Sequence, residues 1–268
     1  MEPFFLPGER GQRFCLYHPP QGATRGAIIY VHPFAEEMNK ARRMAALQSR
    51  AMAQAGYAVL QIDLLGCGDS AGDFSEATWL AWQEDVLLAY RWLRTKTQAP
   101  LTLWGLRSGC MVAAHAAVNV PETVNFIYWQ PVVSGKLHWQ QFMRLKMAGE
   151  IASGQAKGAA ELLRNRLAEG EAVEIAGYTI STGLADGLEN AELVPPLVKA
   201  GNVIWIEISM RENVTISPSS MKCIEHWRNA GFRLVSSIVR GPSFWQTAEI
   251  EDAPELLVAT MEALESWQ

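Results

Sequence analysis

Leu-Thr-Leu-Trp-Gly-Leu-Arg-Ser-Gly-Cys, residues 101–110, is the stretch of sequence that decides the fold. It begins as a short apolar run of the kind that forms a buried strand, and small residues typical of a helix follow it. Between the two lies a turn with Gly105 and Gly109 at its outer positions and Arg107 at its centre. A turn this tight needs small residues at the outer positions. The stretch therefore predicts a strand, a sharp turn that presents Arg107, and a helix.

Two other segments of the chain agree with this unit. The run GAIIYV (26–31) leads into a loop over 32–39, and AVLQID (58–63) leads into LLGCGDS (64–70). Strand, tight turn and helix form the nucleophile elbow of α/β-hydrolases, in which the loop after the third strand supplies one N–H of the oxyanion hole. The second loop resembles the D-x-x-G-x-G-x-S turn that is common after the fourth strand of that fold. Together the three segments predict an α/β-hydrolase fold.

The rest of the chain alternates apolar runs with amphipathic stretches, which favours a mostly parallel central sheet flanked by helices. An antiparallel strand is expected at the N-terminal edge, at 13–17. The other predicted strands are 124–129, 203–208 and 234–239, and the predicted helices are 39–55, 78–95, 108–118, 218–230 and 254–267.

The alternation stops between Pro131 and Pro196. Two helices are predicted there, at 137–147 and 155–168, and Pro195 and Pro196 mark the return to the sheet. We therefore expect a helical cap insertion over 134–195, set into an α/β-hydrolase core made of 1–133 and 196–268.

The composition excludes several classes of protein. The chain has 268 residues, 49% hydrophobic and 19% charged, which supports a sizeable core and argues against global disorder. A formal net charge of −5 without a basic stretch argues against nucleic-acid binding. No apolar run is long enough to cross a bilayer, and the N-terminus lacks a signal-peptide pattern. Four cysteines without a CxxC pair, and no metal-ligand spacing, predict a reduced cytoplasmic protein without metal or cofactor.

A serine hydrolase needs a nucleophile on the elbow, a His base, and an acid that orients the His. Arg107 occupies the nucleophile position, and its guanidinium stays protonated at neutral pH, so it serves neither as nucleophile nor as base. The triad His usually follows the last core strand, but VRGPSFWQ (239–246) contains none. Two of the three triad members are therefore missing from their expected positions.

A rearranged site is the alternative. In that case Ser108 or Ser134 is the nucleophile, and His32 or His138 is the base. Centring the elbow on Ser108 shifts its frame by one residue, which places Leu106 where the turn needs a small residue. His32 belongs to the loop expected over the elbow, and His138 belongs to the cap.

Arg107 is expected at the carboxyl end of the sheet, where open α/β sheets bind ligands. Because a buried guanidinium is costly without a partner, we predict an ion pair with Glu36 or Glu37. Two interpretations stay open. The site is a former active site that an ion pair closes, or the Arg107 guanidinium donates two hydrogen bonds to a carboxylate or phosphate of a ligand. The candidate ligand-binding residues are Phe34, Glu36, Glu37, Asn39, Arg107, Trp129, Ser134 and Trp245.

The chain also resembles the exosortase A system-associated hydrolase 2 family of bacteria. The resemblance implies an α/β-hydrolase fold and an association with bacterial exopolysaccharide and PEP-CTERM protein-sorting loci, but no particular substrate. The segments that carry it are HPFAEEMNKARR (32–43), DLLGCGDS (63–70), GLRSG (105–109), WQPVVSG (129–135), QFMRLKMA (141–148) and GPSFWQTAEI (241–250).

Two classes of function follow. The favoured class is a degenerate hydrolase, or pseudoenzyme, that binds a small acyl-bearing or anionic ligand near exopolysaccharide machinery. The other is an active ester or thioester hydrolase, or an acyltransferase, with the rearranged site described above. Both have a small-molecule partner, and neither predicts an oligomeric state.

Overall fold

The computed structural model describes residues 1–152 and 159–267 of the chain. An eight-stranded sheet runs through its middle in the order β1-β2-β4-β3-β5-β6-β9-β10. The β1–β2 hairpin joins β4 antiparallel at one edge, and the remaining strands pair in parallel, which confirms the predicted sheet. The strands are β1 (Glu2–Gly8), β2 (Gly11–His18), β3 (Gly26–Val31), β4 (Tyr57–Ile62), β5 (Leu101–Leu106), β6 (Val124–Trp129), β9 (Asn202–Ser209) and β10 (Arg233–Arg240).

Parallel pairing brings the carboxyl ends of the central strands to one edge of the sheet. Every residue of β3, β5 and β6 is buried, as expected for strands covered on both faces. Val31 pairs with Ile62 on one side and with Gly105 on the other. The three segments that predict the fold therefore leave the sheet side by side.

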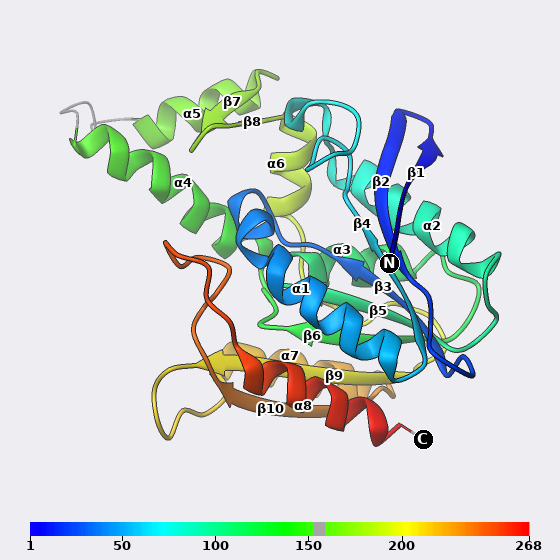
Figure 1. Cartoon of the computed structure of the whole chain (residues 1–268). Helices are drawn as coiled ribbons and strands as arrows, with labels where there is room; N and C mark the ends of the chain where they lie inside the picture. Colours follow the sequence, from blue (N-terminus) through cyan, green and yellow to red (C-terminus); the bar gives the residue numbers. More distant parts are fainter. Residues whose placement is uncertain (153–158, 268) are drawn as a thin grey trace.

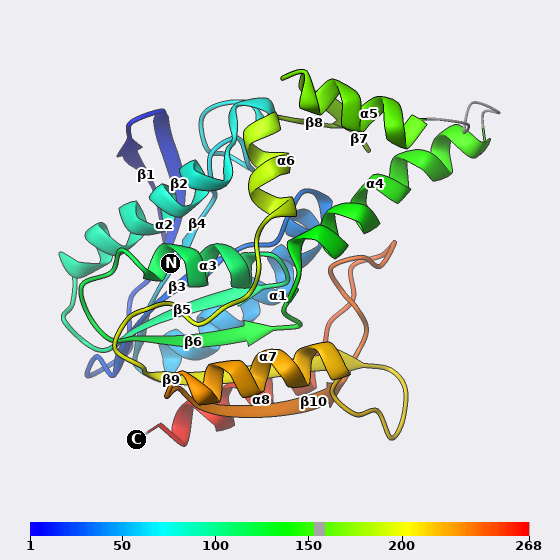
Figure 2. The same cartoon turned by 180° about the vertical axis from the view of Figure 1, so that it is seen from behind.

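Helices cover both faces of the sheet (Figures 1 and 2). α1 (Glu36–Gln54) and α8 (Pro254–Glu265) lie against one face. α2 (Trp79–Arg94), α3 (Gly109–Ala117) and α7 (Pro218–Asn229) lie against the other. Each face has its own apolar core, and the buried tryptophans are divided between them: Trp104 and Trp129 lie on the α1 side, Trp205 and Trp227 on the α7 side.

The described residues of the predicted insertion, 134–152 and 159–195, are called the cap segment below and lie over the carboxyl edge of the sheet (Figure 1). Of the helix predicted at 155–168, residues 155–158 fall outside the described part of the chain. The described elements are α4 (Gly135–Ala152), α5 (Ala159–Ala168), β7 (Val173–Ile175), β8 (Tyr178–Ile180) and α6 (Thr182–Glu189).

The start of α4 is held tightly against the end of α6. The Gly135 N–H donates to the carbonyl of Ala191 over 2.8 Å. A Cβ atom at Gly135 would overlap the carbonyl of Leu188, so only glycine allows this approach. The contact sets where α4 begins and therefore where His138, one turn further along, is presented.

Four local elements differ from the prediction. β1 was not predicted, because Pro3 and Pro7 argue against a strand, yet an edge strand tolerates both. α1 begins at Glu36 rather than at 39, because its N-cap, Ala35, has no capping side chain to mark the start. A short 3-10 helix (Phe74–Glu76) and α6 were also not predicted, although the Ser181 hydroxyl caps α6 by accepting the Leu184 N–H.

Candidate functional site

The turn between β5 and α3 has the strained geometry of an elbow. Arg107 has a φ of 54°, in the left-handed region that ordinary residues avoid. A Cβ atom at Gly105 would lie 2.6 Å from the backbone N of Cys110, and one at Gly109 would overlap the Val31 carbonyl. The two glycines are therefore required by close backbone contacts, and the turn delivers the Arg107 side chain to the carboxyl edge of the sheet.

Arg107 forms an ion pair with the first turn of α1. Its Nε donates to Glu37 Oε1 over 3.2 Å, so Glu37 rather than Glu36 is the partner. Glu37 Oε2 is buried without a partner among the described residues. The two Nη groups of Arg107 also make no hydrogen bond within the described chain, and the guanidinium carbon lies 5.4 Å from the centre of the Trp245 ring. The pair thus uses only part of the bonding capacity of each residue.

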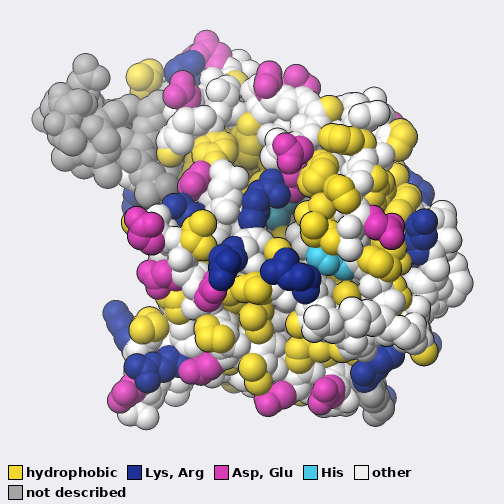
Figure 3. All heavy atoms as spheres, in the orientation of Figure 1, with side chains coloured by type: hydrophobic (Ala, Val, Ile, Leu, Met, Phe, Trp, Pro, Cys, Tyr) yellow, Lys and Arg dark blue, Asp and Glu magenta, His cyan; other side chains and the backbone are white. Residues whose placement is uncertain are grey.

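This ion pair forms one side of a cavity of about 300 Å³. The cavity lies between the start of α1, the elbow, the first turns of α4 and the loop after β10. On the face seen in Figure 3, Lys and Arg side chains gather over α1, with acidic and apolar side chains beside them. The lining residues are Phe34, Ala35, Glu36, Glu37, Lys40, Arg107, His138, Gln141, Phe142, Trp245 and Gln246.

His138 is the titratable group that α4 contributes to this cavity. Its side chain is buried, with 6% of the residue exposed, and neither ring nitrogen has a hydrogen-bond partner in the described part of the chain. Its ring meets Phe34 edge-on at 6.1 Å. Burial lowers the pKa of His138 below its ordinary value; Glu37 opposes this shift and Arg107 adds to it. At neutral pH the ring is therefore uncharged, with one donor and one acceptor nitrogen.

Several predicted ligand-binding residues lie at or beside the cavity. Phe34, Glu36 and Trp245 line it together with Arg107. Asn39 lies just outside, where its amide donates to Glu36 and to the Tyr178 hydroxyl. Trp245 stands in the loop after the last strand, where a triad His is normally found.

Two further predicted residues lie elsewhere. The Trp129 ring is fully buried in the core on the α1 side, where its Nε1 donates to the Thr260 hydroxyl over 2.9 Å. The Ser134 hydroxyl donates to Glu192 over 3.0 Å, at the junction of α4 and the end of the cap segment. Neither side chain lines the cavity.

The groups named for a rearranged hydrolase site are not hydrogen-bonded to one another in the described part of the chain. His32 bridges two backbone groups: Nδ1 donates to the Pro33 carbonyl over 2.8 Å, and Nε2 accepts the Leu64 N–H over 3.1 Å. Both ring nitrogens of His32 are thus occupied. Ser108 is 1% exposed at the start of α3. In residues 1–152 and 159–267, no hydrogen bond joins a serine hydroxyl to a histidine ring.

Two backbone N–H groups stand where the fold would place the donors of an oxyanion hole. In α/β-hydrolases its two N–H donors come from the residue after the nucleophile and from the loop after the third strand. The corresponding N–H groups here are those of Ser108 and Phe34. Neither donates to another group of the described chain. Both N–H groups are therefore unpaired within the described residues, next to a side chain that cannot act as a nucleophile.

Sequence reasoning missed three of the polar groups in the cavity wall. Lys40 follows Glu37 by one helical turn, and its Nζ donates to the Ala248 carbonyl over 2.8 Å. Gln141 follows His138 by one turn on α4, and Gln246 follows Trp245 directly. The spacing of three residues would have identified Lys40 and Gln141 once Glu37 and His138 were known to face the cavity.

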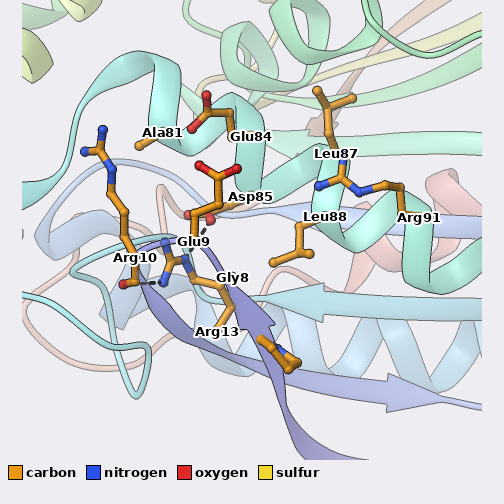
Figure 4. A pocket seen from close by; sticks show the side chains of 11 residues that line it. Gly8, Glu9, Arg10, Arg13, Ala81, Glu84, Asp85, Leu87, Leu88 and Arg91 are labelled. Carbon is orange, nitrogen blue, oxygen red and sulfur yellow. Dashed lines mark hydrogen bonds and ion pairs between the residues drawn. The ribbon is translucent and has the colours of Figure 1, made fainter.

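A second cavity, of about 380 Å³, lies between the β1–β2 hairpin and α2 (Figure 4). It holds a buried ion pair in which Arg13 Nε donates to Asp85 Oδ1 over 2.6 Å. The other Asp85 oxygen accepts the Leu65 N–H, and Arg13 Nη1 donates to the carbonyls of Arg10 and Gly11. These two side chains are bonded on several sides, which is typical of a structural contact.

Metal-binding clusters and membrane-spanning helices are both absent from the described residues. Among them, no group of three or more His, Cys, Asp or Glu side chains is arranged to hold a metal ion. No helix in that part of the chain is both long and apolar enough to cross a membrane.

Solved structures share this architecture. A carboxyl esterase from Bacillus coagulans is 11% identical with a TM-score of 0.65, and the match covers 99% of this chain and 98% of that one. Est1E from Butyrivibrio proteoclasticus, solved with ferulic acid, is 12% identical with a TM-score of 0.63 and 98% coverage of both chains. An α/β serine hydrolase without a lid from Xanthomonas campestris is 15% identical with a TM-score of 0.60, covering 99% and 94%. These likenesses confirm the α/β-hydrolase fold.

Sequence comparison gives the family. Human protein ABHD12B is 28% identical over 114 residues, which are 42% of this chain and 30% of that protein. The chain thus matches less than a third of that relative's length. The family described as serine aminopeptidase, S33, matches residues 22–167, more than half of the chain. The protein therefore belongs to the serine aminopeptidase S33 family, and its elbow carries Arg107 in place of serine.

Proposed function

We propose that this protein binds a small ligand with an anionic group at Arg107, and that it is a degenerate member of its family rather than a hydrolase. The observation that carries the proposal is the guanidinium at the elbow. Its two Nη groups have no partner in the described chain, while its Nε bonds to Glu37. A planar guanidinium with free donors suits a carboxylate or a phosphate.

The competing interpretation is a former active site held shut by an ion pair. Such a pair is expected to bond closely on several sides, because burying a charge is favourable only when its hydrogen-bonding capacity is met. The Arg107–Glu37 pair instead has one hydrogen bond of 3.2 Å, and Glu37 Oε2 has no partner within residues 1–152 and 159–267. The open cavity beside it supports ligand binding over closure.

The walls of the cavity indicate the rest of the ligand. Phe34, Phe142 and Trp245 contribute aromatic surface around the charged pair. Ligand sites generally combine apolar walls with a few polar groups, in volumes from about 300 Å³ upwards. A small molecule with an anionic end and an apolar or acyl-bearing body fits this description.

The resemblance to exosortase A system-associated hydrolase 2 proteins supports a setting for this activity. We place the protein in the bacterial cytoplasm, near the machinery for exopolysaccharide and PEP-CTERM protein sorting. In that setting it acts as a binding or carrier protein for a small acyl or carboxylate compound.

The binding test compares phenylacetate with its neutral amide, phenylacetamide, by isothermal titration calorimetry. We expect the wild type to prefer the acid, and Arg107→Met to weaken binding of the acid by about 10- to 100-fold, the usual range for losing a hydrogen bond to a charged group. Arg25→Met, an exposed arginine at the opposite edge of the sheet, is the control and leaves binding unchanged. Equal affinity for acid and amide contradicts the proposal.

The hydrolase test uses a fluorophosphonate reagent with intact-mass readout, together with short and long acyl p-nitrophenyl esters. We expect no covalent adduct and no turnover above background, because the elbow presents a guanidinium. A stoichiometric adduct that Ser108→Ala abolishes overturns the degenerate assignment and supports the rearranged hydrolase site. Ser134→Ala serves as the second serine variant in the same assay.

A further inference from the structure

The cavity beside Arg107 is lined by residues with buried polar atoms that have no hydrogen-bond partner in the described structure. Seven side-chain N or O atoms of the described chain are buried without a hydrogen bond, and four of them belong to residues that line this cavity. The four are Glu37 Oε2, both ring nitrogens of His138, and Nε1 of Trp245. Buried polar groups are nearly always bonded, so such a concentration in one cavity points to a ligand that supplies the missing partners.

These atoms specify what a ligand must offer. Glu37 Oε2 is an acceptor only, so it needs a donor from the ligand. The neutral His138 ring has one donor and one acceptor nitrogen, and Trp245 Nε1 donates. Together with the free Nη groups of Arg107, the cavity offers donors toward an anion and acceptors toward a hydroxyl or an amine.

The charges on the wall are balanced. Arg107 and Lys40 are offset by Glu36 and Glu37. Glu36 is engaged by the Tyr178 hydroxyl at 3.0 Å, and Lys40 by the Ala248 carbonyl. Arg107 and Glu37 are therefore the charges left to select a ligand, and their opposite signs suit a molecule with an anionic group and a donor.

The distance between Arg107 and Glu37 sets how far apart the two binding groups of the ligand are. Arg107 Nε and Glu37 Oε1 are 3.2 Å apart, so a group on the guanidinium and a group on the free carboxylate oxygen must be close neighbours. Resting on the proposed anion binding at Arg107, we infer that the ligand is a small carboxylic acid with a hydroxyl or amino group on the adjacent carbon. The carboxylate binds Arg107, and the hydroxyl or amine donates to Glu37 and contacts His138. His138 is then a specificity-determining residue, placed over the pair by the cap segment.

The test uses matched probes: mandelate, phenylglycine and phenylacetate share the aromatic ring and the carboxylate and differ at the adjacent carbon. Calorimetry of the wild type is expected to show mandelate or phenylglycine binding at least tenfold more tightly than phenylacetate. In His138→Phe the preference shrinks to about threefold or less, with phenylacetate affinity little changed. Glu37→Gln is an independent second variant with the same expectation. Thermal unfolding of each variant establishes that it is folded.

NMR spectra of protein labelled with 15N at histidine show whether the His138 ring contacts the ligand. A purely structural role of His138 would leave these resonances unchanged on ligand binding. Mandelate is expected to shift the His138 ring resonances of the wild type, and phenylacetate is expected to leave them unchanged. Equal affinity for all three probes, with binding lost in Arg107→Met, overturns this inference and leaves the proposed function standing. If none of the three acids binds with a Kd below about 10 mM, both the inference and the proposed function fail.

Discussion

Two cavities of this protein each hold an ion pair between an arginine and a carboxylate, and they use it differently. In the larger one Arg13 and Asp85 approach to 2.6 Å, and their side chains are 3% and 6% exposed. Backbone groups occupy the other Asp85 oxygen and Arg13 Nη1. In the smaller one Arg107 and Glu37 share one hydrogen bond of 3.2 Å, and Glu37 Oε2 has no partner among the described residues.

The difference supports the proposal that the first pair is structural and the second binds a ligand. Arg13 and Asp85 join the N-terminal hairpin to α2 and to the loop after β4, so their bonding serves the fold. Arg107 and Glu37 stand at the elbow with bonding capacity to spare. Cavity volume does not follow this difference, because the larger cavity holds the pair with more hydrogen bonds. The proposed function therefore rests on unmet hydrogen bonding and not on cavity volume.

The strongest challenge to this comparison is Asp85→Asn. Removing one charge leaves Arg13 buried and unpaired, so we expect the free energy of unfolding to fall by about 3–5 kcal/mol. Urea denaturation measures it, with Asp186→Asn on the exposed surface of α6 as the control, expected to change stability by about 0.5 kcal/mol or less. A loss no larger than that of the control means that Arg13 and Asp85 do not stabilise the fold.

Gly105→Ala tests the rigid part of the site. An added Cβ meets the backbone of Cys110 at 2.6 Å, which a side chain cannot relieve, so we expect a loss of about 1–3 kcal/mol by the same method. Gly183→Ala on α6 is the matched control. A Cβ atom added at Gly183 would lie 3.1 Å from a Thr78 methyl group, and the free energy of unfolding of this variant is expected to change by about 1 kcal/mol or less. Equal effects of the two changes would show that the elbow is loosely packed.

Glu37→Gln sharpens the comparison directly, because it makes at the elbow the change that Asp85→Asn makes in the other cavity. The side chains of Arg107 and Glu37 are 16% and 20% exposed and share one long contact. We expect the free energy of unfolding to change by about 1 kcal/mol or less. If Glu37→Gln costs as much as Asp85→Asn, the pair at the elbow is structural after all.

The smallest expected effect is on the pH dependence of stability. Burial lowers the pKa of His138 in the folded protein, so in the window below the ordinary His value the unfolded chain binds more protons than the folded one. The stability that the neutral His138 ring contributes is therefore complete above about pH 6.5, and it is lost as the pH falls toward the pKa of His138 in the folded protein. Relative to His138→Phe, the wild type should lose more stability between about pH 7.5 and pH 5.

The same pH comparison has an internal control. Burial also lowers the pKa of His32, but His32 is present in both proteins and cancels in the difference. Parallel stability curves for wild type and His138→Phe would mean that the His138 ring is well solvated in solution.

Most of the fold could be predicted because the central strands are continuous apolar runs and the elbow has an unmistakable spacing of glycines. The hairpin strand β1 could not, because prolines at an exposed edge look like loop residues. The first turn of α1 was missed for a related reason: Ala35 adopts a φ of 51° without a polar side chain that would announce a helix start.

Site residues could be predicted where their position along the chain places them at the site. They could not be predicted where the direction of the side chain decides whether it faces the cavity. Arg107 and Trp245 follow from the ends of β5 and β10. The choice of Glu37 over Glu36 depends on the rotation of α1, which residues 36–39 alone do not reveal. Trp129 ends a strand buried on both faces, so its hydrophobicity carries no information about which face it takes.

The left-handed backbone at position 107 has a consequence for engineering. The conformation depends on the neighbouring glycines and strand ends rather than on the side chain at this position. A substitution at position 107 alone therefore changes the functional group that faces the cavity. A carboxylate, an amide or a thiol introduced there would be surrounded by the same cavity walls.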